Sequence, residues 1–139
     1  MTHTILLVED EDIIRTTLKE FLIGEGFLVT DASSVEAALQ LVRKQDFEVA
    51  VCDVQLPDGD GVQLLKKMRQ INSEMFGLII TAYATVENAV EAFKAGAFDF
   101  LIKPVIFEDL ANKLRRMFEY RGLYLENIQL RRELTVHED

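Results

Sequence analysis

Acidic, hydroxyl and cationic side chains follow short apolar runs at four points along the chain. Glu9 and Asp10 come directly after the first run, Asp53 after the third, Thr81 after the fourth and Lys103 after the fifth. Three carboxylates held together repel one another unless a hard divalent cation with oxygen ligands neutralises them. These residue types therefore predict a magnesium site, with Thr81 and Lys103 suited to the oxygens of a phosphoryl group.

The ligands expected for this magnesium ion are all oxygens. Asp10 and Asp53 can each give one carboxylate oxygen and Gln55 its backbone carbonyl, while Glu9 is expected to act from the outer shell through water. Waters complete the set, because magnesium keeps several of them. With the metal and Lys103 offsetting the charge of the transition state, Asp53 is a competent nucleophile towards a phosphoryl donor.

The apolar runs that precede these residues have the length of strands. Several are continuously apolar, as strands buried on both faces of a parallel sheet require. Segments of helical period lie between them, so the pattern is a strand and a helix repeated five times. It predicts a doubly wound α/β sheet with its site beyond the carboxyl ends of the strands. The predicted strands are centred on 5–8, 27–29, 49–51, 78–80 and 100–102.

Glycine and serine residues mark the expected helix ends. Gly24 and Gly26 are predicted to end the first helix and Gly96 the fourth, because glycine adopts the left-handed conformation of a C-terminal cap. Ser33 with Glu36 is expected to form a capping box at the start of the second helix.

Composition limits the classes of partner. The chain has 139 residues, enough for one domain, and 24 acidic against 15 basic side chains give a net charge of −9. A general attraction to nucleic acid or anionic lipid is therefore not expected. The single Cys52 lies in an apolar run and reads as a buried hydrophobe. Without a signal peptide or an apolar run approaching about 18 residues, we expect a cytoplasmic protein with no membrane contact.

Four motifs in this order and at these intervals resemble those of response regulator receiver domains, over residues 4 to about 121. They are Val8-Glu9-Asp10-Glu11, Asp53-Val54-Gln55-Leu56-Pro57-Asp58-Gly59-Asp60-Gly61, Thr81-Ala82 and Lys103-Pro104. The resemblance implies a five-stranded, flavodoxin-like parallel sheet of order 2-1-3-4-5. It also implies a sensor histidine kinase as partner and Mg²⁺ as cofactor.

The resemblance assigns individual roles as well. Asp53 is implied as phosphoacceptor and Asp10 with Glu9 as the acidic pair. Thr81, the backbone of Ala82, and Lys103 are implied as phosphoryl contacts, with a cis peptide bond before Pro104. Phe100 stands where many receivers have a switch tyrosine, and its rotamer is expected to follow Thr81 without any phenolic hydrogen bond.

The last helix is expected to begin near Phe107 and to continue past residue 121. Spacings of three and four pick out a heptad seam with one polar position, which predicts a homodimer through a coiled coil: Tyr120, Leu123, Asn127, Leu130 and Leu134. Residues 125–134 resemble the linker of nitrogen-regulation-class activators, in which an AAA+ ATPase and a DNA-binding domain follow the receiver. We therefore expect a receiver at 1–121 and a helical linker at 122–139, leading to an output domain outside this chain.

Other functions fit fewer of the residues. A haloacid dehalogenase-type phosphatase also uses a nucleophilic aspartate with magnesium, but it needs a second aspartate where Gln55 stands. Asp58 and Asp60 suggest a calcium loop, yet no acidic residue closes it, and turn chemistry explains both. A receiver-like binding module without phosphorylation and a stand-alone single-domain regulator remain as alternatives. For the stand-alone regulator, removal of residues beyond 121 would leave self-association unchanged.

Overall fold

The computed structural model describes residues 2–83 and 85–137, with side chains through residue 134. Its centre is a sheet of five parallel strands in the order β2-β1-β3-β6-β7, which confirms the predicted order 2-1-3-4-5 of the five main strands. The strands are β1 (Thr4–Val8), β2 (Leu28–Ala32), β3 (Val49–Asp53), β6 (Phe76–Thr81) and β7 (Ala97–Ile102).

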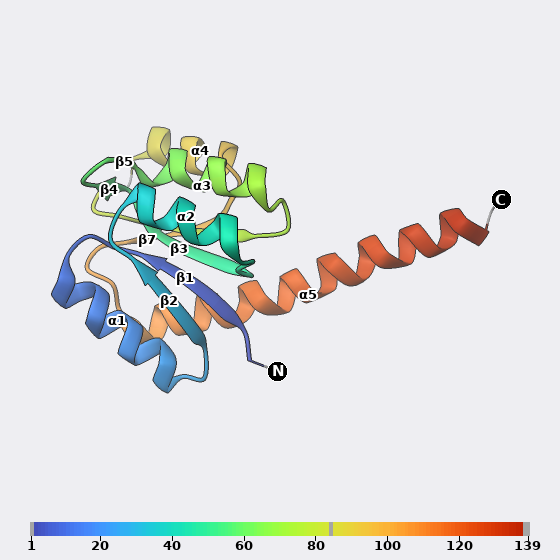
Figure 1. Cartoon of the computed structure of the whole chain (residues 1–139), viewed down its shortest axis with the longest axis horizontal. Coiled ribbons are helices and arrows are strands. Elements are labelled where there is room, and N and C mark those ends of the chain that lie inside the picture. Colours follow the sequence, from blue (N-terminus) through green and yellow to red (C-terminus); the bar gives the residue numbers. More distant parts are fainter. Residues whose placement is uncertain (1, 84, 138–139) are drawn as a thin grey trace.

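Helices cover both faces of this sheet (Figure 1). They are α1 (Asp12–Gly24), α2 (Val35–Lys44), α3 (Gly61–Ile71), α4 (Val86–Lys94) and α5 (Phe107–His137). Alternate residues of β1 enter two separate cores: Leu6 and Val8 pack with α2 and α3, while Ile5 and Leu7 pack with α1 and α5. Both faces of the strand are therefore apolar, which is why the sequence shows a continuous run instead of an alternation.

Two expectations about local structure need correction. The second strand is Leu28–Ala32 instead of 27–29, because this edge strand continues through the polar residues Thr30 and Asp31. Ser34, not Ser33, caps α2, and its side chain accepts a hydrogen bond from the Ala37 N–H at 3.1 Å. The helix begins one residue later than the expected capping box required. Gly26 and Gly96, with φ of 98° and 100°, follow α1 and α4 as predicted.

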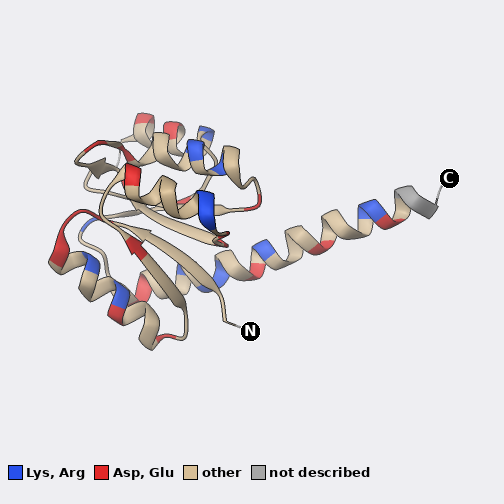
Figure 2. Ribbon diagram, viewed as in Figure 1, with Lys and Arg blue, Asp and Glu red and all other residues tan. Residues whose placement is uncertain are grey.

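The C-terminal helix α5 is 31 residues long and extends well beyond the sheet (Figure 1), which confirms that it continues past residue 121. Acidic and basic side chains are interspersed along it (Figure 2). Within the described part of the chain, no helix is both long and apolar enough to cross a membrane.

The part of α5 around Phe118 and Arg121, from which the extension begins, contacts the amino ends of the strands. Arg121 donates to the Glu48 carboxylate at 3.2 Å and to the Glu74 carbonyl at 2.9 Å. The His3 ring stacks on Phe118 with centroids 4.2 Å apart. These contacts join α5 to the start of β1 and to the connections that precede β3 and β6.

Candidate functional site

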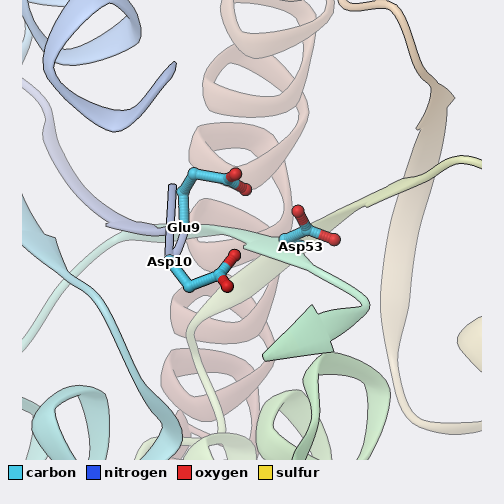
Figure 3. Close-up of side chains that lie close together, drawn as sticks. All are labelled: Glu9, Asp10 and Asp53. Atoms are coloured by element: carbon cyan, nitrogen blue, oxygen red, sulfur yellow. The ribbon is translucent and has the colours of Figure 1, made fainter. Parts of the chain in front are cut away.

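The carboxyl ends of β1 and β3 bring three carboxyl groups together. Each of Glu9, Asp10 and Asp53 offers an oxygen within 4.8 Å of the others, and Figure 3 shows the three side chains converging. The parallel pairing of Val8 with Cys52 sets this arrangement, since Glu9 and Asp10 follow β1 and Asp53 ends β3. The predicted acidic cluster therefore forms.

The Glu9 carboxyl group is buried, with 3% of the residue exposed. Its Oε1 atom is the one buried side-chain oxygen or nitrogen, among the residues that the structure describes, without a hydrogen-bond partner. A buried polar atom without a partner is unfavourable and calls for a ligand or water. This unpaired oxygen, beside two further carboxylates, fits a hard cation such as magnesium.

Lys103 supplies the positive charge of the site, as the sequence predicted. Its Nζ donates to Asp53 Oδ2 at 2.5 Å and lies 3.9 Å from Glu9 Oε2. The Lys103 backbone N–H bonds to the Thr81 carbonyl at 2.8 Å, and the peptide bond to Pro104 is cis, as the resemblance implied. The other oxygen of Asp53, Oδ1, accepts from the Gln55 backbone N–H at 3.0 Å.

The proximity of these groups separates their pKa values. Burial, followed by the hydrogen bond and the charge of Asp53, raises the pKa of Glu9 to about 8. Burial also acts to raise the pKa of Asp53, but hydrogen bonds from Glu9, Lys103 and Gln55 outweigh it and hold that pKa below its ordinary value. In the metal-free site, Glu9 therefore keeps its proton to higher pH than Asp53, which ionises first.

Thr81 and Phe100 line one cavity of about 130 Å³ between α3, α4 and the sheet. The Thr81 hydroxyl bonds to the Tyr83 backbone, donating to its carbonyl at 3.1 Å and accepting from its N–H at 3.0 Å. It thus faces the start of α4 instead of Asp53. Phe100 is half-buried and meets the Phe93 ring edge-on at 6.1 Å. Ala82, the remaining phosphoryl contact implied by the resemblance, is exposed.

The segment after Asp53 forms a small hairpin, β4 (Gln55–Leu56) with β5 (Gly59–Asp60), that the sequence patterns did not predict. At its end, a Cβ on Gly61 would lie 1.9 Å from the Asp53 carbonyl oxygen, so only glycine fits there. The two aspartates that turn chemistry was expected to explain are helix caps. Asp60 accepts from the Val62 N–H of α3 at 2.6 Å, and Asp58 caps α2. Asp60 directly precedes a segment of helical period, so its role as the N-cap of α3 could have been predicted from the sequence.

The residues of the predicted seam on α5 are exposed along the described part of the helix: Tyr120, Leu123, Asn127, Leu130 and Leu134. Tyr120 also contacts its own domain, because its ring lies 5.2 Å from that of Phe98 and 6.3 Å from that of Phe76. The first seam position is therefore partly engaged within the chain.

Comparison with known proteins identifies relatives over most of the chain. Transcriptional regulatory protein ZraR of Escherichia coli K12 is 43% identical over 119 residues, covering 84% of this chain and 27% of the relative. Regulatory protein AtoC of the same strain is 34% identical over 134 residues, covering 96% and 29%. The chain thus spans between a quarter and a third of these relatives' length.

Solved structures share the fold. A CheY-like response regulator receiver domain protein from Methanospirillum hungatei JF-1 superposes with a TM-score of 0.85 at 31% identity, covering 89% of this chain and 99% of that one. The model of the response regulator receiver domain matches residues 5–115, which include all of the sheet except Thr4 and all of the acidic cluster. The chain therefore belongs to the response regulator receiver domain family.

Proposed function

We propose that this chain is a phosphorylation-controlled switch, which accepts a phosphoryl group on Asp53 from a sensor histidine kinase in the presence of Mg²⁺. The observation that carries this proposal is the position of the Asp53 carboxylate. It lies at the end of the central strand β3, hydrogen-bonded to Lys103 and clustered with the acidic pair Glu9 and Asp10. Membership of the receiver family supports the histidine kinase as donor.

The residues present fit a magnesium ion with oxygen ligands. Asp10 and Asp53 would each contribute a carboxylate oxygen, Gln55 its carbonyl, and Glu9 a contact through water. Bound there, the ion would supply positive charge against the carboxylates and the phosphoryl oxygens. Lys103 already bonds Asp53 and is placed to neutralise a phosphoryl oxygen on that carboxylate. An Asp53 oxygen forms the new bond to phosphorus as the phosphorus–nitrogen bond of the donor phosphohistidine breaks.

Phosphorylation is then read by Thr81. Its hydroxyl would exchange the Tyr83 carbonyl for a phosphoryl oxygen, with the Ala82 backbone N–H as a further donor. Movement of Thr81 changes the packing of the cavity that it shares with Phe100, and the phenyl ring follows it. Such a switch needs two states of similar free energy, which the phosphoryl group biases.

An apolar groove beside the site suits the kinase. It has a volume of about 580 Å³ and is lined by α1, by the connection from Lys103 to Val105 and by Phe107 at the start of α5. Ile13 is 77% exposed there, although it is a large apolar side chain. A helical, histidine-bearing domain that covered these apolar residues would deliver its phosphoryl group beside Lys103, and hence beside Asp53.

The output is proposed to lie outside this chain. Residues 1–121 would form the receiver and residues 122–139 a helical linker, which dimerises through the seam on α5 and leads to an AAA+ ATPase with a DNA-binding domain. Relatives named as transcription regulators, of which the chain covers about a quarter, support this assignment. On this account the chain itself makes no contact with DNA.

Two measurements test the switch and the dimer. With Mg²⁺ and beryllofluoride, a stable phosphoryl mimic, the NMR signals of Thr81 and Phe100 should shift in the wild-type chain but not in Asp53→Asn. No shift in either protein would contradict the switch. In sedimentation, a chain ending at residue 121 should be monomeric where the full chain is dimeric. Equal self-association of both would instead favour the stand-alone regulator.

A further inference from the structure

Asp58 ties the hairpin that follows Asp53 to a distant helix. Its Oδ1 accepts from the Val35 backbone N–H at 2.8 Å and its Oδ2 from the Glu36 N–H at 3.0 Å. Both donors belong to the first turn of α2, where N–H groups have no partner inside the helix. Ser34 takes the next N–H, that of Ala37, so α2 is capped jointly by its own serine and by a residue of the hairpin.

The same hairpin carries the backbone that would complete the metal site. Gln55 pairs with Asp60 and Leu56 with Gly59, which leaves Pro57 and Asp58 at the tip. At the base, Asp60 caps α3 and the Gly61 N–H bonds to the Val54 carbonyl at 2.8 Å. The hairpin is therefore held by α3 at its base and by α2 at its tip. Among the described residues, Asp58 makes the only hydrogen bonds between the hairpin and α2.

We infer that Asp58 is a positioning residue, which fixes the Gln55 carbonyl for a divalent cation by fastening the hairpin to the first turn of α2. The inference rests on the proposed function, because it takes Gln55 as a ligand. Gln55 and Asp58 are themselves exposed, and Leu56 is the hairpin strand residue that packs against the core, so the tip depends on Asp58 for its attachment to α2. Magnesium demands near-ideal octahedral geometry, and small displacements of one ligand therefore lower its affinity.

The test compares Asp58→Ala with Ser34→Ala in the full chain. Both variants remove caps from α2 and should lower its stability by similar amounts. Only Asp58→Ala releases the hairpin, and calorimetry should show its Mg²⁺ affinity falling by about tenfold, the effect typical of residues that orient a metal ligand. Ser34→Ala should bind Mg²⁺ as the wild-type chain does. Asp58→Asn keeps one acceptor oxygen and should recover part of the affinity, although it removes the same charge.

Amide hydrogen exchange gives a readout that does not depend on metal. Without Mg²⁺, Asp58→Ala should speed exchange at Gln55 and Leu56 as well as at Val35 and Glu36. Faster exchange confined to Val35 and Glu36, with unchanged Mg²⁺ affinity, would overturn the inference and make Asp58 a cap alone. Equal loss of affinity in Asp58→Asn and Asp58→Ala would also overturn it, in favour of a charge effect. If the wild-type chain itself failed to bind Mg²⁺, the proposed function would fall as well.

Discussion

Buried and half-buried carboxyl groups at the two ends of the sheet differ in how completely their oxygens are paired. At the amino ends of the strands, Glu48 is fully engaged: its two oxygens contact the Thr4 N–H and hydroxyl, the His3 ring and Arg121 at 3.1 to 3.4 Å. At the carboxyl ends, Glu9 is more deeply buried, yet its Oε1 has no hydrogen-bond partner among the described residues. Here two of the three clustered carboxyl groups, those of Glu9 and Asp53, pair with the same lysine, Lys103.

This difference separates stability from function within one fold. The Glu48 carboxylate joins the start of β1 to α5, and all of its contacts are made within the chain, so it needs no ligand. The clustered carboxyl groups of Glu9, Asp10 and Asp53 repel one another when ionised, which raises the free energy of the metal-free state. Binding of a cation would lower that free energy. We expect substitutions at the amino ends to change stability alone, and those at the carboxyl ends to change ligand binding.

The largest effect is expected at Gly61, where fold and site coincide. The Cβ of Gly61→Ala would meet the Asp53 carbonyl oxygen and carbon at 1.9 and 2.8 Å, and both are backbone atoms that cannot turn aside. We expect the free energy of unfolding, measured with denaturant, to fall by about 3 kcal/mol, together with a loss of Mg²⁺ binding. Gly122→Ala is the control, because its Cβ meets nothing within 4 Å. Equal stability of the two variants would contradict this expectation.

Glu48→Ala should lower the stability of the fold without changing the chemistry at the carboxyl ends of the strands. The hydrogen bonds of Thr4 and Arg121 to this carboxylate would be lost, and denaturant unfolding should show a decrease of about 2 kcal/mol. Glu48→Gln keeps an acceptor oxygen and should lose less. Phosphorylation of Asp53 should proceed in both variants as in the wild type. A fall in Mg²⁺ affinity would show instead that the two ends are coupled.

Glu9→Gln should have the opposite effects: it should raise the stability of the metal-free protein and weaken Mg²⁺ binding. Because the pKa of Glu9 in the folded chain is about 8 against an ordinary 4.5, the folded state binds a proton more tightly than the unfolded state. Metal-free wild-type protein therefore loses stability as pH rises from about 4.5 to about 8, and glutamine removes this loss. With EDTA, thermal unfolding should show the variant gaining on the wild type across that window, while its Mg²⁺ affinity falls about tenfold. A constant difference in melting temperature would contradict the assigned pKa.

The smallest effect is expected at Asp31, on the edge strand. Its carboxylate pairs with Lys19 at 2.7 Å and Arg15 at 3.0 Å. Burial acts to raise its pKa, but these two cations hold that pKa below its ordinary value of 3.8. The pairs therefore stabilise the fold above that pH and are lost as pH falls. Asp31→Asn should lose about 1 kcal/mol in denaturant unfolding at pH 7, and the difference should shrink as pH falls below 3.8. A difference that did not shrink there would have another cause.

The sequence predicts most strongly the features that repeat along the chain. Continuous apolar runs predicted the parallel sheet, and each polar residue that follows a run was placed at the correct edge because parallel strands share their carboxyl ends. The hairpin of β4 and β5 was missed because two-residue strands show no periodicity. The second strand was shifted because Thr30 and Asp31 are polar, which an edge strand tolerates.

Partnerships between distant residues were beyond the reach of sequence patterns. Asp58 reads as a turn residue, and its partners Val35 and Glu36 lie more than twenty positions earlier. Thr81 lies at the end of its strand, as its place after an apolar run predicted, but only the folded structure shows that its hydroxyl bonds to the Tyr83 carbonyl. The sequence therefore indicates which groups meet at the site, whereas the contacts that hold each group in one of two states depend on tertiary structure.

We expect the carboxyl end of the sheet to accept a phosphoryl group on Asp53. Intact mass spectrometry after incubation with acetyl phosphate tests it most directly, with and without Mg²⁺, on the wild-type chain and on Asp53→Asn. We predict one added phosphoryl group, only in the wild type and only with Mg²⁺. No adduct in any sample, or an adduct that persists in Asp53→Asn, would show that Asp53 is not the phosphoacceptor.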